Sequence, residues 1–111
     1  MKRLLCAAAA VVCLSSAAQA QDWTLENTCQ TYASWAGVVF ESRQKNASLG
    51  DIIDAAMANT KFPPSMTQSF IDIAIGTYKI PAADFEMNSN FYSNQRNWEN
   101  SVYAVCMEDN R

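Results

Sequence analysis

Two cysteines near the ends of the expected mature chain place the tightest limit on its fold. The sequence has four cysteines, but Cys6 and Cys13 lie in an N-terminal stretch with the features of a removable leader. Cys29 and Cys106 remain, and in an exported protein a single remaining pair is most simply one disulfide. A redox pair or an intermolecular link is the alternative, although no Cys-x-x-Cys motif supports it. We therefore expect the first and last structural segments to be covalently joined.

Residues 1–20 have the three-part pattern of a secretory signal peptide. Met1–Arg3 carry two positive charges, on Lys2 and Arg3, and Leu4–Leu14 form an apolar run. Ala18 and Ala20 then provide the small residues of a cleavage site. A membrane anchor or a buried helix is the alternative, but the run is shorter than the roughly 20 apolar residues that span a bilayer. We expect cleavage near Ala20, a periplasmic or secreted location, no transmembrane span after cleavage, and one helical domain over residues 21–111.

The charge of the expected mature chain limits the classes of partner. The full chain has a formal charge of −3 that includes Lys2 and Arg3; without them it has 6 basic and 11 acidic side chains, hence −5. No basic cluster is present. Nucleic acid is therefore excluded as an expected partner, and an anionic lipid surface is disfavoured, because both require concentrated Lys and Arg.

Apolar residues recur at three- and four-residue steps over most of the mature chain, and this spacing is typical of helices. Only 3 glycines and 3 prolines are present, which disfavours an all-β fold with many tight turns. We predict an all-α fold, a small bundle of about four helices with the first and last linked by one disulfide. The expected helices are 24–45, 48–58, 65–80 and 90–107, with a turn or loop over 81–89.

Local residue types suggest where these helices begin and what they bury. Ser48 followed by Asp51 resembles a capping box, and Ser65 is a good N-cap for the next helix. Gly37 weakens the first helix or permits close packing of another helix. The helix over 65–80 is expected to be the most buried.

Core contacts are also expected near the C-terminus. Phe85 and Met87 can pack from the loop, and the inner side of the last helix is expected to be Phe91, Trp98, Val102, Val105 and Cys106.

The residue inventory excludes several kinds of catalytic and metal site. The chain contains no histidine, which removes histidine-based catalysis and histidine metal ligands. No phosphate-binding or calcium-binding loop motif is present, so we expect no cofactor and no metal. The close carboxylate pairs Asp51 with Asp54 and Asp84 with Glu86 keep a small hydrolase open as a hypothesis, but a helix start and a loop explain them structurally.

A second stripe on the last helix is the candidate partner-binding surface. Tyr92, Arg96, Glu99 and Tyr103 are separated by steps of four, three and four residues, which places them beside the core-facing stripe. Tyr and Arg are enriched at binding hot spots. The structural alternative is an amphipathic shoulder on which Arg96 and Glu99 form a weak surface pair. Trp23 and Trp35, like Tyr92 and Tyr103, are expected off the main core stripes.

Arg43 is a separate candidate, because it lies on the apolar stripe of the first helix. An arginine at that place binds an anionic ligand, pairs with a buried carboxylate, or satisfies the terminal carbonyls of its helix. We keep both the anion-binding and the structural interpretation.

A set of positions spread over the mature chain resembles a known class of protein. These are Cys29, Arg43, Leu49–Asp51, Tyr78–Pro81 and the closing Tyr103–Cys106. In this order they resemble small, helical, signal-bearing proteins of Gram-negative bacteria and their phages. The resemblance implies a periplasmic location and supplies no activity. Size, acidity and a single bridge are also similar to those of periplasmic acid-stress chaperones, but the cysteines lie further apart here and the lysine-rich character of those proteins is missing.

These observations lead to a functional expectation. We expect an exported, non-enzymatic interaction protein that binds a periplasmic or envelope protein, in an inhibitor, immunity or phage-exclusion role. The alternatives are a small-molecule or lipid-binding module that uses a cavity between aromatic-rich helices, and an acid-stress chaperone-like protein.

Overall fold

The structure is a computed structural model that describes residues 23–110, so the expected signal peptide lies outside the described residues. This part of the chain contains four α-helices, two short 3-10 helices and no strand, which confirms the all-α prediction. The α-helices are α2 (Leu25–Gln44), α3 (Leu49–Ala58), α4 (Thr67–Tyr78) and α5 (Phe91–Asp109). The 3-10 helices are η1 (Pro64–Met66) and η2 (Ala82–Phe85).

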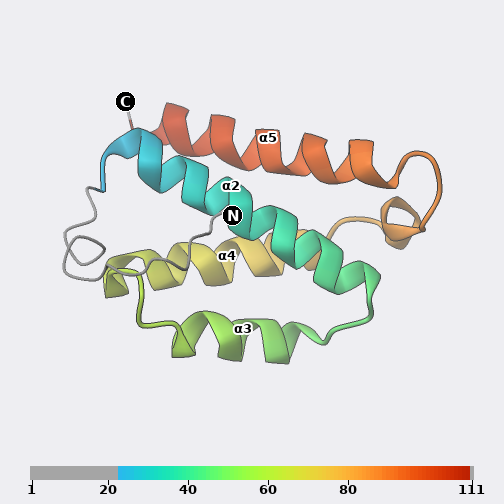
Figure 1. The fold of residues 1–111 in the computed structure, drawn as a ribbon, viewed down its shortest axis with the longest axis horizontal. Helices are drawn as coiled ribbons and strands as arrows, with labels where there is room; N and C mark the ends of the chain where they lie inside the picture. Colours follow the sequence, from blue (N-terminus) through green and yellow to red (C-terminus); the bar gives the residue numbers. More distant parts are fainter. Residues whose placement is uncertain (1–22, 111) are drawn as a thin grey trace, which may run out of the picture.

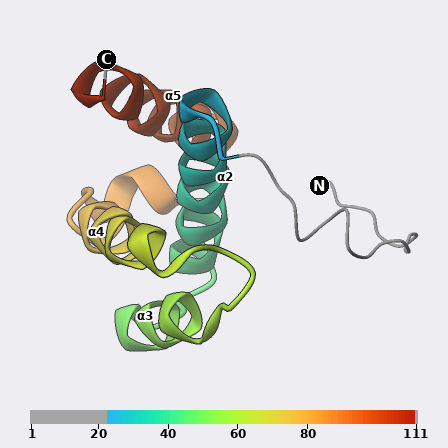
Figure 2. The same cartoon turned by 90° about the vertical axis from the view of Figure 1, so that its left-hand side faces the viewer.

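Helix α2 is the central element of the bundle. It packs against α5 on one side and against α4 on the other, while α3 lies beyond α4 (Figures 1 and 2). The chain runs in opposite directions in α2 and α5, and in the same direction in α2 and α4 (Figure 1). Helix α4, the 65–80 helix expected to be the most buried, also has a neighbour on two sides, α2 and α3, and its buried residues are Phe70, Ala74 and Thr77.

Two hydrogen bonds fix the parallel alignment of α2 and α4. The indole nitrogen of Trp35 donates to the carbonyl of Phe70 at 2.9 Å, and the guanidinium of Arg43 donates to the carbonyl of Tyr78 at 3.1 Å. Both pairs are 35 residues apart. Equal separations are what two parallel helices of the same rise per residue require.

The buried apolar side chains form three clusters along this frame. Their members are Val39, Ile52 and Ala74; Phe40, Phe85 and Phe91; and Ala56, Met66 and Phe70. Trp35 packs against two of the clusters, and its ring centroid lies 5.4 Å from that of Phe70. The expected position of Trp35 off the core is therefore wrong. Its indole ring spans the contact between α2 and α4, which a helical stripe on α2 alone does not reveal.

The starts of the helices agree with the sequence prediction in one of two cases. The backbone N–H of Asp51 donates to the Ser48 hydroxyl at 3.1 Å, so Ser48 caps α3 as expected. Ser65 does not cap α4, because it lies inside η1, which begins at Pro64 and leads directly into the helix. A proline in a first helical turn loses no hydrogen bond, since that N–H has no intrahelical acceptor.

Two expected core residues near the C-terminus are exposed. Phe85 is buried as predicted, but Met87 is 57% exposed and Val105 is 56% exposed. Val105 was expected on the inner side of the last helix, and that expectation is wrong. Helix α5 packs mainly against α2, so only a narrow side of it is covered.

The disulfide between Cys29 and Cys106 is formed, and it joins the start of α2 to the end of α5. The two Cα atoms are 5.6 Å apart, and both residues are buried. This confirms the expected link between the first and last helices. The 77-residue separation closes almost the whole described chain into a loop.

Removing this disulfide is expected to destabilise the protein strongly. A loop of this length reduces the entropy of the unfolded chain by an amount equivalent to about 4.5 kcal/mol at 25 °C. For a domain of this size the melting temperature of a Cys29→Ala, Cys106→Ala variant should fall by about 15 °C or more. Circular dichroism melts of the oxidised, reduced and double-Ala proteins measure this. Equal melting temperatures for all three would contradict a structural role.

Candidate functional site

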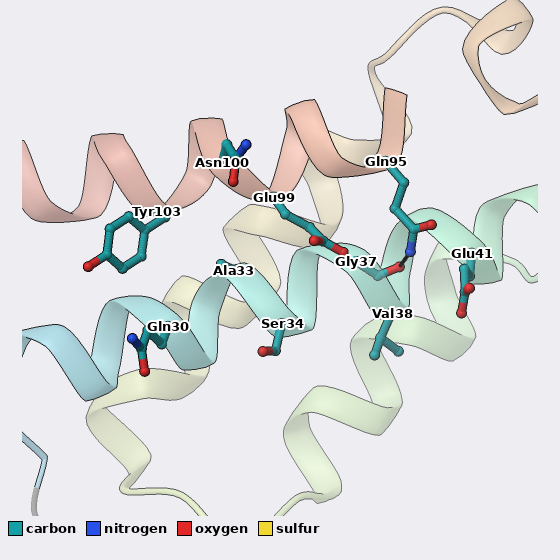
Figure 3. A pocket seen from close by; sticks show the side chains of 10 residues that line it. All are labelled: Gln30, Ala33, Ser34, Gly37, Val38, Glu41, Gln95, Glu99, Asn100 and Tyr103. Carbon is teal, nitrogen blue, oxygen red and sulfur yellow. Dashed lines mark hydrogen bonds between the residues drawn. The ribbon is translucent and has the colours of Figure 1, made fainter. Parts of the chain in front are cut away.

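Helix α5 approaches α2 closely at Gly37. A Cβ atom added to Gly37 would overlap the carboxylate of Glu99, so only glycine leaves room for this side chain. The side-chain amide of Gln95 donates to the Gly37 carbonyl at 3.0 Å. Figure 3 shows both side chains reaching from α5 to this point on α2. The alternative that Gly37 permits close helix packing is the one the structure supports.

A groove of about 650 Å³ runs along the line where the two helices meet. Side chains of both helices line it, and most of them are polar or small (Figure 3). The lining residues are Gln30, Ala33, Ser34, Gly37, Val38 and Glu41 from α2, and Gln95, Glu99, Asn100 and Tyr103 from α5. No Lys or Arg is among them, so both charged lining groups are carboxylates.

Glu99 is the electrostatically unusual member of this groove. Burial raises the pKa of its carboxyl, the nearby Arg96 opposes this increase, and Glu41 adds to it. Within residues 23–110 no side chain or backbone N–H donates a hydrogen bond to the Glu99 carboxylate. A half-buried carboxylate without a donor is poorly solvated, and it is stabilised by any donor or cation that enters the groove.

The structure separates the four residues of the predicted stripe. Glu99 and Tyr103 are half-buried and line the groove, whereas Arg96 is exposed and acts on Glu99 through its charge. Tyr92 is 58% exposed and does not line the groove. Its ring lies 5.2 Å from that of Phe91. The stripe therefore consists of two exposed side chains, Tyr92 and Arg96, followed by two half-buried ones, Glu99 and Tyr103.

Arg43 has a set of contacts that explains its place on the apolar stripe. Besides the hydrogen bond to the Tyr78 carbonyl, its guanidinium lies 5.0 Å from the ring centroid of Tyr78 and 4.5 Å from that of Phe85. The Tyr78 hydroxyl in turn donates to the Ala47 carbonyl at 2.5 Å. These contacts join the end of α2, the α2–α3 turn and the end of α4. They give Arg43 a structural role.

The two carboxylate pairs do not form an acidic site. Asp51 and Asp54 are exposed on α3, and Asp84 is half-buried beside the exposed Glu86. Among the described residues, no group of three or more His, Cys, Asp or Glu is placed to hold a metal ion. Of these four residues, Asp84 alone lines one of the three grooves described here.

Sequence reasoning missed the half of the groove that α2 contributes. Gln30 and Glu41 are polar residues on a helix that was interpreted through its apolar stripe, and Gln95 lies outside the predicted stripe of α5. Gly37 was the available signal, because a glycine within a helix often marks the close approach of another segment. It indicates the contact but does not identify the facing residue.

Comparison with known proteins gives no match. No protein-family model, no curated protein and no solved structure shows significant similarity to this chain. None of the helices in the described part of the chain is both long and apolar enough to cross a membrane. The function is therefore argued from the geometry of the site itself.

Gly37 and Glu99 are expected to be energetically coupled. A Gly→Ala change in a helix interior normally stabilises by about 1 kcal/mol, but here the new Cβ must displace the Glu99 carboxylate. Gly37→Ala should therefore be neutral or destabilising alone, and stabilising in a Glu99→Ala background. A double-mutant cycle from urea denaturation should give a coupling energy of about 1 kcal/mol. Additive effects would show that the two residues do not share space.

The stability of the protein is expected to depend on the ionisation of Glu99. Because the pKa of its carboxyl is raised in the folded state, the folded protein binds more protons than the unfolded chain between the ordinary value of 4.5 and the raised value. Stability then falls as pH rises through that window.

A Glu99→Gln variant is the matching measurement, because it keeps the shape and removes the charge. It should melt at a higher temperature than the wild type at pH 7, and the difference should vanish as pH falls below 4.5. A difference that is independent of pH, or a less stable variant at pH 7, would contradict the assignment.

Proposed function

We propose that the protein is an exported, non-enzymatic interaction protein that binds another protein of the periplasm or envelope through the α2–α5 groove. An inhibitory, immunity or phage-exclusion role falls in this class. The signal-like pattern of residues 1–20 supports the location, and the residue inventory supports a binding rather than a catalytic role, since the chain contains no histidine.

The half-buried carboxylate of Glu99 is the observation that carries the proposal. It lies in a groove that contains a second carboxylate, Glu41, and no lining cation. This arrangement costs stability in the free protein, and a Lys or Arg side chain of a partner offsets that cost by pairing with both groups. Tyr103 adds an aromatic ring of the type enriched at interfaces.

A protein partner suits this groove better than the alternative ligands. The groove is open along the helices and is lined mainly by polar groups (Figure 3), whereas small-molecule sites are predominantly apolar. Two carboxylates also disfavour an anionic lipid. A basic side chain presented by a folded partner supplies both the charge and the surface to cover Tyr103.

The test is quantitative capture of partners from a periplasmic extract of the host on the immobilised, disulfide-bonded mature protein. Neutralising the groove by Glu41→Gln with Glu99→Gln should weaken capture by at least about tenfold, because unpairing a desolvated interfacial charge costs several kcal/mol. The variant is expected to be at least as stable as the wild type, so unfolding does not explain a loss.

The matched control is Asp51→Asn with Asp54→Asn, which removes the same charge from α3, where both side chains are exposed. This control should capture the same proteins as the wild type. Equal loss in both variants would indicate attraction by net charge, and retention of every partner by the groove variant would refute the proposed site.

A further inference from the structure

A second hollow lies on the opposite flank of α5, between that helix and α4. Both helices pack on α2, but they hardly pack on each other. At one end the Trp98 indole N–H donates to the Thr77 hydroxyl at 2.9 Å and ties α5 to α4. Toward the start of α4 and the end of α5 the two helices leave a cleft of about 390 Å³. Figure 2 shows α5 above α4, with α2 to the right of α4 and reaching up to α5.

The floor and walls of this cleft are mainly apolar. Tyr32 of α2 lies at its base and packs edge-on against Phe70, with ring centroids 5.5 Å apart. Ile73 lines the α4 side, and Val102 and Val105 line the α5 side. Val105 is 56% exposed. Cys106 also lines the cleft, and its disulfide to Cys29 fixes the α5 wall to α2.

The rim of the cleft is acidic on both sides. Asp72 of α4 and Asp109 of α5 line it, and no Lys or Arg does. Gln68 donates to the Asp72 carboxylate at 2.9 Å, which leaves its negative charge in place. Asp109 lies in the last turn of α5, where the helix dipole is negative and a carboxylate destabilises the helix. The charge at this end of the cleft therefore does not serve the stability of α5.

From this geometry we propose that the cleft binds an amphipathic helix of a partner protein, with an apolar face flanked by Lys or Arg. Helices α2, α4 and α5 supply three members of a four-helix arrangement, and the guest helix occupies the fourth position opposite α2. The cleft-lining residues of α5 run from Trp98 to Asn110 and span about 18 Å, so a guest of three to four turns matches the length of the cleft. This surface is separate from the α2–α5 groove and goes beyond the function proposed above.

The charge of the rim selects this occupant over the others. A second copy of the chain is itself acidic, with ten Asp or Glu against five Lys or Arg in residues 23–110, so it would add like charges to Asp72 and Asp109. An anionic lipid would do the same. A basic helix pairs with both carboxylates while its apolar side chains cover Val102 and Val105.

Isothermal titration calorimetry with a designed peptide tests the proposal. The probe is a 14-residue peptide with Leu at the a and d heptad positions and Lys at the flanking positions, and its counterpart carries Glu in place of Lys. The Lys peptide should bind the disulfide-bonded mature protein with 1:1 stoichiometry, and the Glu peptide should bind at least tenfold more weakly.

Four variants locate the binding. Asp72→Asn with Asp109→Asn should weaken binding of the Lys peptide about tenfold. The melting temperature of this variant should stay equal or rise, because the end of α5 loses an unfavourable charge. Val105→Asn, at an already exposed position, should weaken binding of the Lys peptide about tenfold through lost apolar contact.

Asp51→Asn with Asp54→Asn is the charge-matched control and should bind the Lys peptide like the wild type. Glu41→Gln with Glu99→Gln should also bind like the wild type, which separates this cleft from the α2–α5 groove.

Several outcomes would overturn the proposal. These are no binding of the Lys peptide, equal weakening by the α3 control, and full binding by the Val105 variant. Dimerisation that depends on Val105, or binding of phosphatidylglycerol vesicles that depends on it, would assign the cleft to a second copy or to a membrane surface instead.

Discussion

Helix α5 is held on the fold mainly by its contact with α2. The disulfide secures one end, the space at Gly37 lets the helices approach in the middle, and the rings of Phe40 and Phe91, 5.5 Å apart, pack at the other end. Because support comes from one side, both flanks of α5 stay open as grooves. The binding surfaces proposed here are a consequence of this single line of support.

Much of the fold could be predicted because its signals are local. The helical spacing and the Ser48 cap each depend on residues a few positions apart, and the pairing of Cys29 with Cys106 was predicted on the expectation that residues 1–20 are a leader. The exposure of Val105 and the burial of Trp35 could not be predicted in the same way. The exposure of each side chain depends on which other helix packs against its own helix. That packing is decided by contacts between residues distant in sequence.

The same limit applies to the candidate site. The stripe on α5 contained Glu99 and Tyr103, but the facing residues Gln30 and Glu41 follow only from the register of α5 on α2. Glu99 and Asp109 are also placed where charge does not favour the free protein, one desolvated and one at the negative end of a helix. Unfavourable placement of charge that only a partner relieves is a common property of binding surfaces.

The disulfide has a further consequence for the covalent integrity of the chain. Residues 30–105 form a closed ring, since the bridge joins the residues on either side of them. A protease that cuts once in the exposed segment between α3 and η1, for example at Lys61, leaves both fragments attached and their core contacts in place. In a compartment with active proteases, one nick would release no part of the molecule, and separation into fragments would require reduction as well as cleavage.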